Sequence, residues 1–374
     1  MYEEIFTSVL HPWYASLENP EESQRKTFEI LRESYQKTGY GKKYGAHVET
    51  VDEFRDAFPV ATFNDFLPHI EEVRKGNWQA LLPEPPVEWG MTRGSTGASK
   101  IVPFTSLDMH QKSIAGSRGT LNYVYKTKKY DVLSGYALNN NFPSKVGTMT
   151  VGNTEVDYGY STGIYAKYAT KGGKIKFLPT PEQINQLGAG LTKKDWERRF
   201  DFTYNEARNR NVTMVTGAAQ GMIHFGTFLK KKYNIYPKDV WKKPLLVCAS
   251  LPGIQTKEKP VLKAMYDFLD LREMYGATEG IYAQQLDERP YVFPNYDFYF
   301  LEVETKDEIK MLYELKKGER GSLIISSCLF PRYKIGDVVK SFGGSAFTCL
   351  GRETNFNVVT YYWERLMGQM LFRI

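Results

Sequence analysis

The stretch TRGSTGASK, residues 92–100, is the part of this chain around which the rest is arranged. It places two glycines, four hydroxyl side chains, an arginine and a lysine within nine positions. Residues 87–91 before it and 102–104 after it have the composition of short strands. A turn of this kind can point backbone N–H groups and hydroxyls at an anion while the lysine supplies positive charge. The spacing is not that of a Walker A loop. The stretch therefore predicts either a phosphate-holding loop or an ordinary exposed turn.

The composition is that of a soluble globular protein. The chain has 374 residues, of which 42% are hydrophobic, 14% aromatic and 25% charged, and this favours two or three packed units over disorder. The net charge is +6, but lysines and arginines are interleaved with acids and form no basic block. We therefore expect no nucleic-acid partner, whereas an anionic small ligand suits the mild positive excess.

Cysteine use and the N-terminus point to a cytoplasmic location. Cys248, Cys328 and Cys349 are scattered singly in or beside apolar runs, which predicts buried, reduced thiols and no structural zinc site. Residues 1–4, MYEE, lack the basic-then-apolar form of a signal peptide. No apolar run approaches the roughly 20 residues of a transmembrane helix. We expect no membrane partner, and the sequence does not predict an oligomeric state.

Residues 1–85 have the signals of a helical layer. Asn19 caps a helix that we expect to end at Gly39. Thr50, with a glutamate three residues later, is a capping box that opens a second short helix. Residues 62–75 have the pattern of a third helix with an internal proline.

The middle of the chain, residues 86–285, predicts parallel-rich sheets with covering helices. Residues 131–163 are rich in Gly, Asn and Tyr, and we expect strands and loops there. From residue 195, strand and helix patterns alternate, which is typical of a parallel sheet. We expect helices at 196–209, 218–231 and 257–269 and strands at 212–215, 244–249 and 271–274. Ligands bind at the carboxyl ends of such strands, where residues 275–279 fall.

Residues 286–350 change character. Strand patterns at 296–303 and 321–326, separated by polar turns, predict a small barrel-like antiparallel subdomain. The predicted fold class is thus α/β with α+β elements. Residues 1–350 would form one large domain, and residues 351–374 a hinge and a short tail.

Four segments occur in the order and rough spacing of the adenylate-forming superfamily. Residues 92–100 resemble its glycine-rich loop, residues 275–280 its Tyr-Gly-x-Thr-Glu motif, and residues 332–339 its Tyr-Arg-x-Gly-Asp motif, with a Gly-Arg pair at 351–352. Upstream, residues 39–45 and 58–63 look like one branch of it. The chain resembles the auxin-responsive acyl-acid amido synthetases of plants and their microbial relatives.

The resemblance implies a ligase that uses ATP and Mg²⁺. Such enzymes join a carboxylic acid to ATP as acyl-AMP with release of pyrophosphate, then transfer the acyl group to an amine such as an amino acid. An acyl-CoA ligase, with coenzyme A as acceptor, is the alternative. Residues 136–165 and 216–225 are our candidates for the acid pocket.

The resemblance also implies the roles of the glycine-rich loop. Ser95, Thr96 and Lys100 would hold the β- and γ-phosphates, with Gly97 in the same loop, and Lys100 would count as catalytic. Arg93 replaces the usual small hydroxyl residue. The alternative for Lys100 is a solvated surface lysine.

The later motifs imply further roles. Thr278 would touch the α-phosphate, and Glu279 would hold Mg²⁺, which prefers oxygen ligands. Asp337 would accept the ribose hydroxyls. Gly276 and Tyr275, stacked on adenine, and Arg352, near the ribose or α-phosphate, would complete the nucleotide site. The alternatives are a core aromatic for Tyr275, a first-turn acid for Glu279, a turn aspartate for Asp337 and a surface arginine for Arg352.

The chain ends at Ile374, whereas relatives continue into a mobile C-terminal domain that closes over the site. The remaining residues are too few to form it. We therefore weigh a third possibility, a catalytically silent domain that binds nucleotide, although an intact Thr278-Glu279 pair argues against it.

Overall fold

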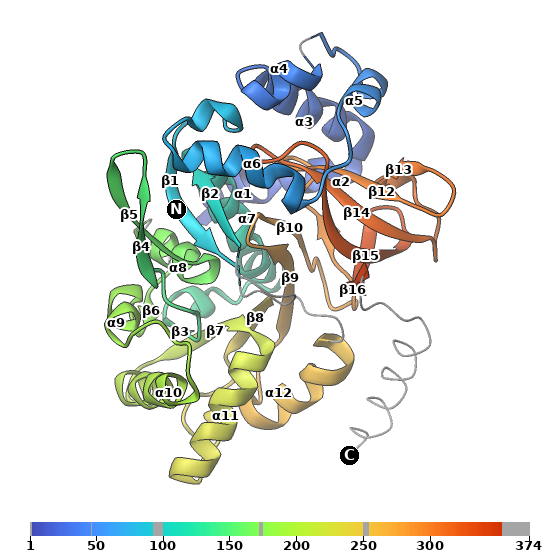
Figure 1. Cartoon of the computed structure of the whole chain (residues 1–374). Helices are drawn as coiled ribbons and strands as arrows, with labels where there is room; N and C mark the ends of the chain where they lie inside the picture. Colours follow the sequence, from blue (N-terminus) through green and yellow to red (C-terminus); the bar gives the residue numbers. More distant parts are fainter. Residues whose placement is uncertain (1, 46, 93–99, 172–174, 250–253, 354–374) are drawn as a thin grey trace.

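Three β-sheets with covering helices make up the computed structural model, which describes residues 2–45, 47–92, 100–171, 175–249 and 254–353 (Figure 1). The largest is a seven-stranded sheet in the order β11-β10-β9-β8-β7-β3-β6. Its strands are β3 (Tyr136–Asn139), β6 (Phe177–Leu178), β7 (Val212–Ala218), β8 (Leu245–Ala249), β9 (Leu271–Ala277), β10 (Gly280–Gln284) and β11 (Phe293–Pro294). β6, β3, β7, β8 and β9 run parallel, which confirms the sheet predicted from the alternating pattern.

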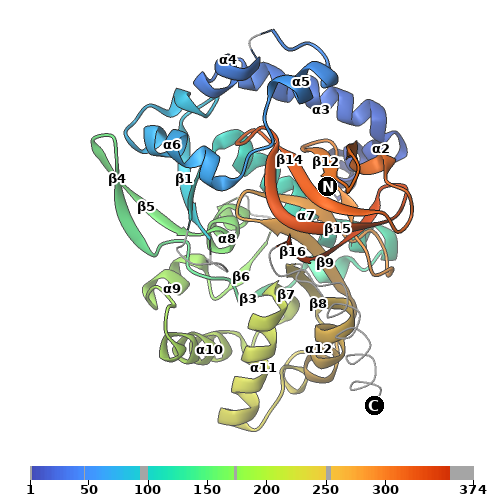
Figure 2. The ribbon, with the colours of Figure 1, turned by 45° about the vertical axis from the view of Figure 1, so that its right-hand side comes forward.

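Both faces of this sheet are buried under helices. Neighbouring residues of a strand point to opposite faces, so adjacent side chains of one strand pack with different helices. On β8, Leu246 and Cys248 pack with α11 (Ala219–Tyr233) and α12 (Lys259–Tyr266). Leu245 and Val247 pack with α1 (Tyr2–Val9), α2 (His11–Glu18) and α7 (Ser106–Thr127). α10–α12 lie at one end of the molecule and α3–α6 at the other (Figure 2). The helices over and beside the sheet are α7 (Ser106–Thr127), α8 (Ser161–Lys171), α9 (Pro181–Gln186), α10 (Lys193–Ala207), α11 (Ala219–Tyr233) and α12 (Lys259–Tyr266).

A four-stranded sheet in the order β2-β1-β5-β4 contains the opening stretch of the sequence. Its strands are β1 (Pro86–Met91), β2 (Ile101–Thr105), β4 (Gly147–Val151) and β5 (Thr154–Tyr160). Met91 pairs with Ile101, and the Thr92 N–H donates to the Lys100 carbonyl at 2.8 Å, so β1 and β2 form a hairpin as expected. Residues 93–99, which include Ser95, Thr96 and Gly97, lie outside the described residues.

The third sheet is antiparallel, as predicted for the region beyond residue 285, and has the order β13-β12-β14-β15-β16. Its strands are β12 (Phe300–Glu304), β13 (Ile309–Met311), β14 (Arg320–Ser326), β15 (Tyr333–Gly343) and β16 (Ala346–Arg352). The predicted strand at 296–303 was wrong in its first half. The N–H groups of Phe298 and Tyr299 donate to the Asn295 carbonyl, so this segment is a turn and the strand begins at Phe300.

Six α-helices precede the first strand in the described part of the chain: α1 (Tyr2–Val9), α2 (His11–Glu18), α3 (Pro20–Tyr35), α4 (Gly39–Gly45), α5 (Val51–Ala57) and α6 (Phe63–Arg74). Asn19 caps α3, and the capping box at Thr50 opens α5, both as predicted. Gly39, however, begins α4 instead of ending α3. The glycines here serve close packing, because a Cβ on Gly41 would lie 2.0 Å from the Tyr35 carbonyl oxygen.

Two further predictions need adjustment. α8 begins at Ser161, inside the stretch expected to hold only strands and loops. The helix expected at 257–269 is shorter, because a π-helical turn occupies Ile254–Glu258 and α12 ends at Tyr266.

The three cysteines are free and buried, as predicted. Among the residues described, none of the helices has both the length and the apolar character needed to cross a bilayer.

Candidate active site

Thr278 and Glu279 form the two-residue turn between β9 and β10, at the carboxyl end of a parallel strand as expected. A Cβ on Gly276 would lie 2.7 Å from the Gly280 carbonyl oxygen, so only glycine fits the turn without displacement. Thr278 and Glu279 are 9% and 5% exposed. The turn therefore places the Thr278 hydroxyl and the Glu279 carboxylate side by side in a nearly buried position.

Asp337 on β15 is held from two sides. The Tyr275 hydroxyl donates to Asp337 Oδ2 at 2.7 Å, and Arg352 Nε lies 3.2 Å from Asp337 Oδ1. Asp337 and Arg352 are direct partners across β15 and β16. Burial raises the pKa of Asp337, an effect that Arg352 and the Tyr275 hydroxyl partly offset. The Tyr275 ring is 3% exposed and packs edge-on against Phe347, so this residue also belongs to the core.

Glu279 reaches the same region through Tyr333, which begins β15. The Tyr333 hydroxyl donates to Glu279 Oε1 at 2.8 Å. Burial and the neighbouring Glu279 carboxylate raise the pKa of Tyr333, so this phenol stays protonated and remains a donor. The structure thus brings together Tyr275, Gly276, Thr278, Glu279, Asp337 and Arg352 from segments about sixty residues apart.

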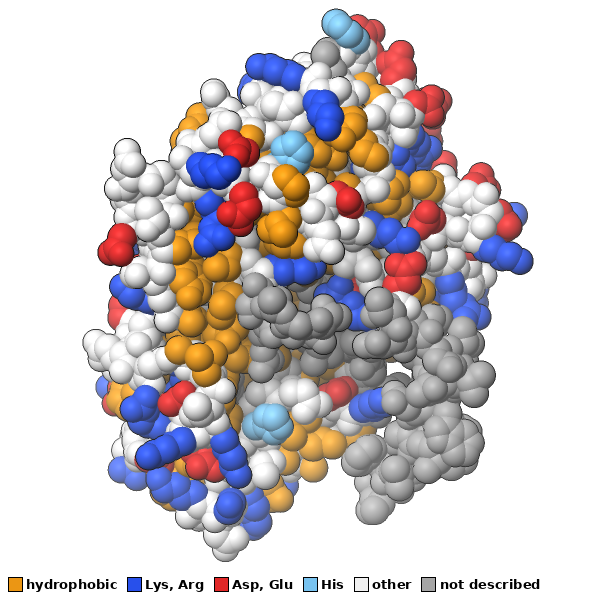
Figure 3. Space-filling view, in the orientation of Figure 1, with side chains coloured by type: hydrophobic (Ala, Val, Ile, Leu, Met, Phe, Trp, Pro, Cys, Tyr) orange, Lys and Arg blue, Asp and Glu red, His pale blue; other side chains and the backbone are white. Residues whose placement is uncertain are grey.

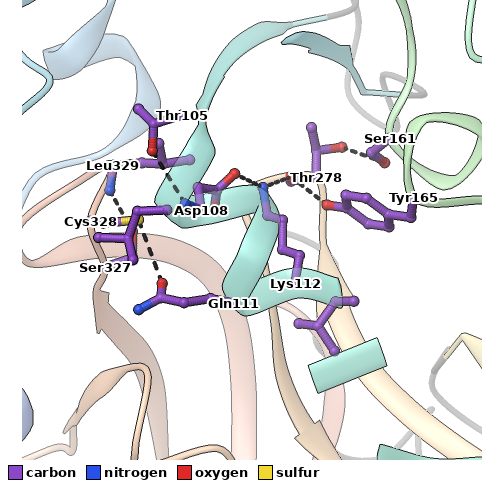
Figure 4. A network of polar contacts seen from close by, with 12 residues as sticks. Thr105, Asp108, Gln111, Lys112, Ser161, Tyr165, Thr278, Ser327, Cys328 and Leu329 are labelled. Atoms are coloured by element: carbon purple, nitrogen blue, oxygen red, sulfur yellow. Dashed lines mark hydrogen bonds and ion pairs between the residues drawn. The ribbon is translucent and has the colours of Figure 1, made fainter. Parts of the chain in front are cut away.

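Below the turn lies a buried polar network that the sequence analysis missed (Figure 4). Lys112 Nζ lies 2.6 Å from Asp108 Oδ2 and donates to the Thr278 carbonyl at 3.1 Å. The Tyr165 hydroxyl donates to the same carbonyl at 2.9 Å, and Ser161 Oγ lies 3.4 Å from Thr278 Oγ1. Three elements, α7, α8 and the turn after β9, therefore meet at one threonine.

The Lys112–Asp108 pair is almost fully shielded from solvent, with side chains 0% and 1% exposed. Burial raises the pKa of Asp108 to about 6 despite the attraction of Lys112, and it lowers the pKa of Lys112. The signal available in the sequence was the i, i+4 spacing of an acid and a lysine on a helix. That spacing is also common on exposed helix faces, so it does not reveal burial.

Lys100 makes its contacts with Thr92, which follows β1, and with α6. Its N–H donates to the Thr92 hydroxyl at 3.0 Å, and its Nζ lies 4.5 Å from the centroid of the Phe63 ring on α6. α6 in turn reaches β15 through an edge-on contact between Phe66 and Tyr333. No contact recorded among the described residues links Lys100 to Glu279 or Asp337, and neither cavity described next is lined by these three.

One cavity, of about 380 Å³, lies among α7, α8, β7, β9 and β10. We call it the Lys112 cavity, because Lys112 is the one charged residue among those that line it. Its walls include Gly116, Tyr165 and Met274 together with Asn141 and Thr216. Asn141, Tyr165 and Thr216 fall in the two segments that we had selected as candidates for the acid pocket.

A second cavity, of about 640 Å³, opens beside α10 and α11, and we call it the Trp196 cavity. Its lining residues are Asn140, Phe142, Lys193, Trp196, Glu197, Phe200, Ala218, Gln220, Gly221, His224, Thr227, Phe228 and Lys231. It too takes residues from both candidate segments. Within the described ranges, no group of three or more His, Cys, Asp or Glu side chains could hold a metal ion alone.

The comparisons with known proteins agree with this architecture. Residues 9–185 match the model of the GH3 family N-terminal domain. A structure titled AtGH3.15 acyl acid amido synthetase in complex with 2,4-DB matches with a TM-score of 0.73 and 14% identity, covering 94% of this chain and 69% of that chain. No curated protein sequence matches the chain.

A second solved structure extends the likeness. 2-Hydroxyisobutyryl-CoA ligase, in the postadenylation state with 2-HIB-AMP, has a TM-score of 0.62 and 12% identity and covers 93% of this chain and 72% of that chain. At such identities the solved structures establish the fold alone. Residues 9–185 are therefore similar to the GH3 family N-terminal domain, and the chain shares the fold of these two solved ligase structures.

Proposed function

We propose that this protein activates a carboxylic acid with ATP, forming acyl-AMP and pyrophosphate, and passes the acyl group to an amine. One observation carries the proposal. The Thr278-Glu279 turn and the Asp337–Arg352 pair, which lie on separate sheets, are joined through Tyr275 and Tyr333. A nucleotide needs ribose acceptors, a phosphate partner and a metal carboxylate in one place, and in the proposal Asp337, Thr278 and Glu279 would take these three roles.

The reaction fits these side chains. A carboxylate oxygen attacks the α-phosphorus, the bond to the β-phosphate oxygen breaks, and pyrophosphate leaves with the electron pair. Two anions must approach, so positioning and charge neutralisation supply most of the rate. In the proposal Asp337 accepts the ribose hydroxyls, Arg352 and Thr278 face the α-phosphate, and Ser95, Thr96, Gly97 and Lys100 hold the outer phosphates.

Mg²⁺ fits Glu279 as its single protein carboxylate. Mg²⁺ is usually held by one or two carboxylates together with substrate phosphates and water, so the lack of a larger acidic group in the described chain is compatible with it. When bound, the ion neutralises phosphate charge. Tyr333 orients the Glu279 carboxylate through its hydrogen bond, and thereby fixes where a cation binds.

The Lys112 cavity is the proposed site for the acid. It touches Met274 and Ile281 on either side of the Thr278 turn, so a carboxylate at that end lies near the proposed α-phosphate position. Its apolar walls suit an aromatic or medium-sized apolar acid.

Residues 1–350 would act as the large domain, with a helical layer at 1–85, nucleotide-binding sheets at 86–285 and an antiparallel subdomain at 286–350.

A cavity-filling substitution tests the acid site. Gly116 on α7 lines the Lys112 cavity, and a Cβ there would meet only the flexible Ile281 Cδ1, at 3.3 Å. Gly116→Leu should raise the KM for the acid in pyrophosphate exchange by at least about ten-fold. Gly116→Ala, which adds one methyl group, should change it far less. An acid KM that Gly116→Leu leaves unchanged contradicts this placement.

Two assays separate the proposal from its alternatives. Exchange of labelled pyrophosphate into ATP, dependent on an added carboxylic acid, is expected for either ligase. Nucleotide binding by calorimetry without exchange for any acid in a broad panel would instead favour a catalytically silent domain. Product formation with amino acids and none with coenzyme A would distinguish an amido ligase from an acyl-CoA ligase.

A further inference from the structure

We propose that the Trp196 cavity binds the acceptor, and that this acceptor is an amino acid with an aromatic or other bulky apolar side chain. This inference rests on the proposed function, since it gives a binding site to the second substrate of that reaction. Three independent features carry it: the position of the cavity, two polar atoms without partners, and the chemistry of the cavity wall.

The two cavities lie on either side of the carboxyl ends of two neighbouring parallel strands, β3 and β7. Asn141 and Gly217 line the Lys112 cavity, whereas the adjacent residues Asn140 and Ala218 line the Trp196 cavity. The strand ends touch, because a Cβ on Gly217 would lie 3.3 Å from the Asn140 carbonyl oxygen. Molecules in the two cavities would therefore border the same two strand ends, and the acyl group and its acceptor would meet around the edge that Asn140 and Gly217 form.

Two polar atoms at this junction have no hydrogen-bond partner among the described residues. They are Asn140 Nδ2, on a residue 5% exposed that lines the Trp196 cavity, and Thr216 Oγ1, in the wall of the Lys112 cavity. Leaving a buried donor unsatisfied destabilises the folded state, so native structures rarely do so without a reason. A ligand oxygen at this position, such as the acyl carbonyl, would satisfy the Asn140 amide.

The wall of the Trp196 cavity is aromatic at its base and basic at its rim. Phe142 and Phe200 are buried and Trp196 is partly buried, whereas Lys193 and Lys231 are exposed. Glu197 is the one acid among the lining residues. Figure 3 shows blue side chains gathered over the end of the molecule formed by α10 and α11. Such a wall suits a bulky apolar group with an anion at its outer end.

In the proposed step the amine nitrogen of this acceptor attacks the acyl carbonyl carbon. The carbon–nitrogen bond forms, the bond from that carbon to the AMP oxygen breaks, and AMP leaves with the electron pair. The proton lost by the amine passes to solvent. No oxidant or further reactant is needed.

Gly221 allows a selective test. It lies in the first turn of α11, lines the Trp196 cavity, and has only the Asn140 carbonyl oxygen, at 3.8 Å, near the position of an added Cβ. Gly221→Leu should raise the ratio of the L-phenylalanine KM to the acid KM by at least about ten-fold. Gly221→Ala should raise this ratio much less. Lys230→Leu introduces a leucine on α11 at a position that does not line the cavity, and should leave both KM values unchanged. Gly116→Leu should lower the ratio.

A binding measurement keeps the inference testable without turnover. Trp196 lies in the cavity wall, so L-phenylalanine should change the protein's tryptophan fluorescence, and Trp196→Phe should remove that change while circular dichroism stays the same. Glycine should give no change at equal concentration. If L-phenylalanine changes the fluorescence without added acid but the protein shows no pyrophosphate exchange, the proposed function is wrong and the binding site in the Trp196 cavity stands. A response to coenzyme A alone, or none that depends on Trp196, would overturn the inference.

Discussion

Lys112→Met should lower the free energy of unfolding by about 3–5 kcal/mol, because it leaves the Asp108 carboxylate buried without its partner. The two side chains are 0% and 1% exposed and 2.6 Å apart, so water cannot replace the lost ammonium. Urea denaturation at pH 7, monitored by circular dichroism, measures the loss. A loss below about 1 kcal/mol, the range of surface ion pairs, would contradict the burial of this pair.

A charge-free double variant provides the control. Asp108→Leu combined with Lys112→Met removes both charges together, and replacing a buried ion pair with apolar side chains is often neutral or stabilising. Most of the stability lost in Lys112→Met should therefore return. Comparing the two variants thus separates the cost of an unpaired Asp108 carboxylate from the cost of replacing the lysine side chain by methionine.

The pH dependence has a definite sign. The pKa of Asp108 is raised to about 6 in the folded protein, above the roughly 3.9 of an unfolded chain, so between these values the folded state binds the extra proton. Its contribution to stability is fully present below the lower pKa and is lost as pH rises through about 6. Removing Lys112 raises the folded pKa further. The deficit of Lys112→Met should therefore shrink as pH falls from 7 to 5.

Local signals in the sequence predicted much of the fold. The strands on either side of residues 92–100, the capping box at Thr50 and the alternation from β7 to β9 all depend on neighbouring residues, and the structure contains each of them. The prediction that Gly39 ends a helix was wrong. It was made because a glycine after a helical pattern commonly ends a helix. Here Gly39 begins α4, and Gly41 allows α4 to approach α3, a tertiary requirement that the local pattern does not contain.

The site could be predicted only in part, for the same reason. Thr278, Glu279 and Asp337 were proposed as site residues from their motifs, but their contacts depend on how two sheets meet. Tyr333 lay inside a quoted motif, yet nothing in its neighbourhood indicated that its hydroxyl would bind Glu279. Asp108 and Lys112 were hidden further, because an i, i+4 ion pair looks the same whether its helix face meets water or a protein core.

Glu279→Gln should reduce acid-dependent pyrophosphate exchange by at least about 100-fold while leaving the fold intact. The amide keeps the size of the side chain, and its oxygen can still accept the Tyr333 hydrogen bond, so the turn after β9 should not move. What it loses is the negative charge proposed to hold Mg²⁺. Exchange measured across a Mg²⁺ titration, with thermal unfolding of the same samples, separates these effects.

Two matched variants decide how a loss in Glu279→Gln is interpreted. Glu258→Gln makes the same change at another buried glutamate, which accepts a hydrogen bond from Gln220 and lies outside the proposed nucleotide site, and should leave exchange unaltered. Tyr333→Phe removes only the donor to Glu279 and keeps the carboxylate, so it should cost less than Glu279→Gln and shift the Mg²⁺ requirement to higher concentration. Exchange by Glu279→Gln at the wild-type rate and with the wild-type Mg²⁺ dependence would refute the metal role. The observed hydrogen bond from Tyr333 would then serve only to hold β15 against the turn.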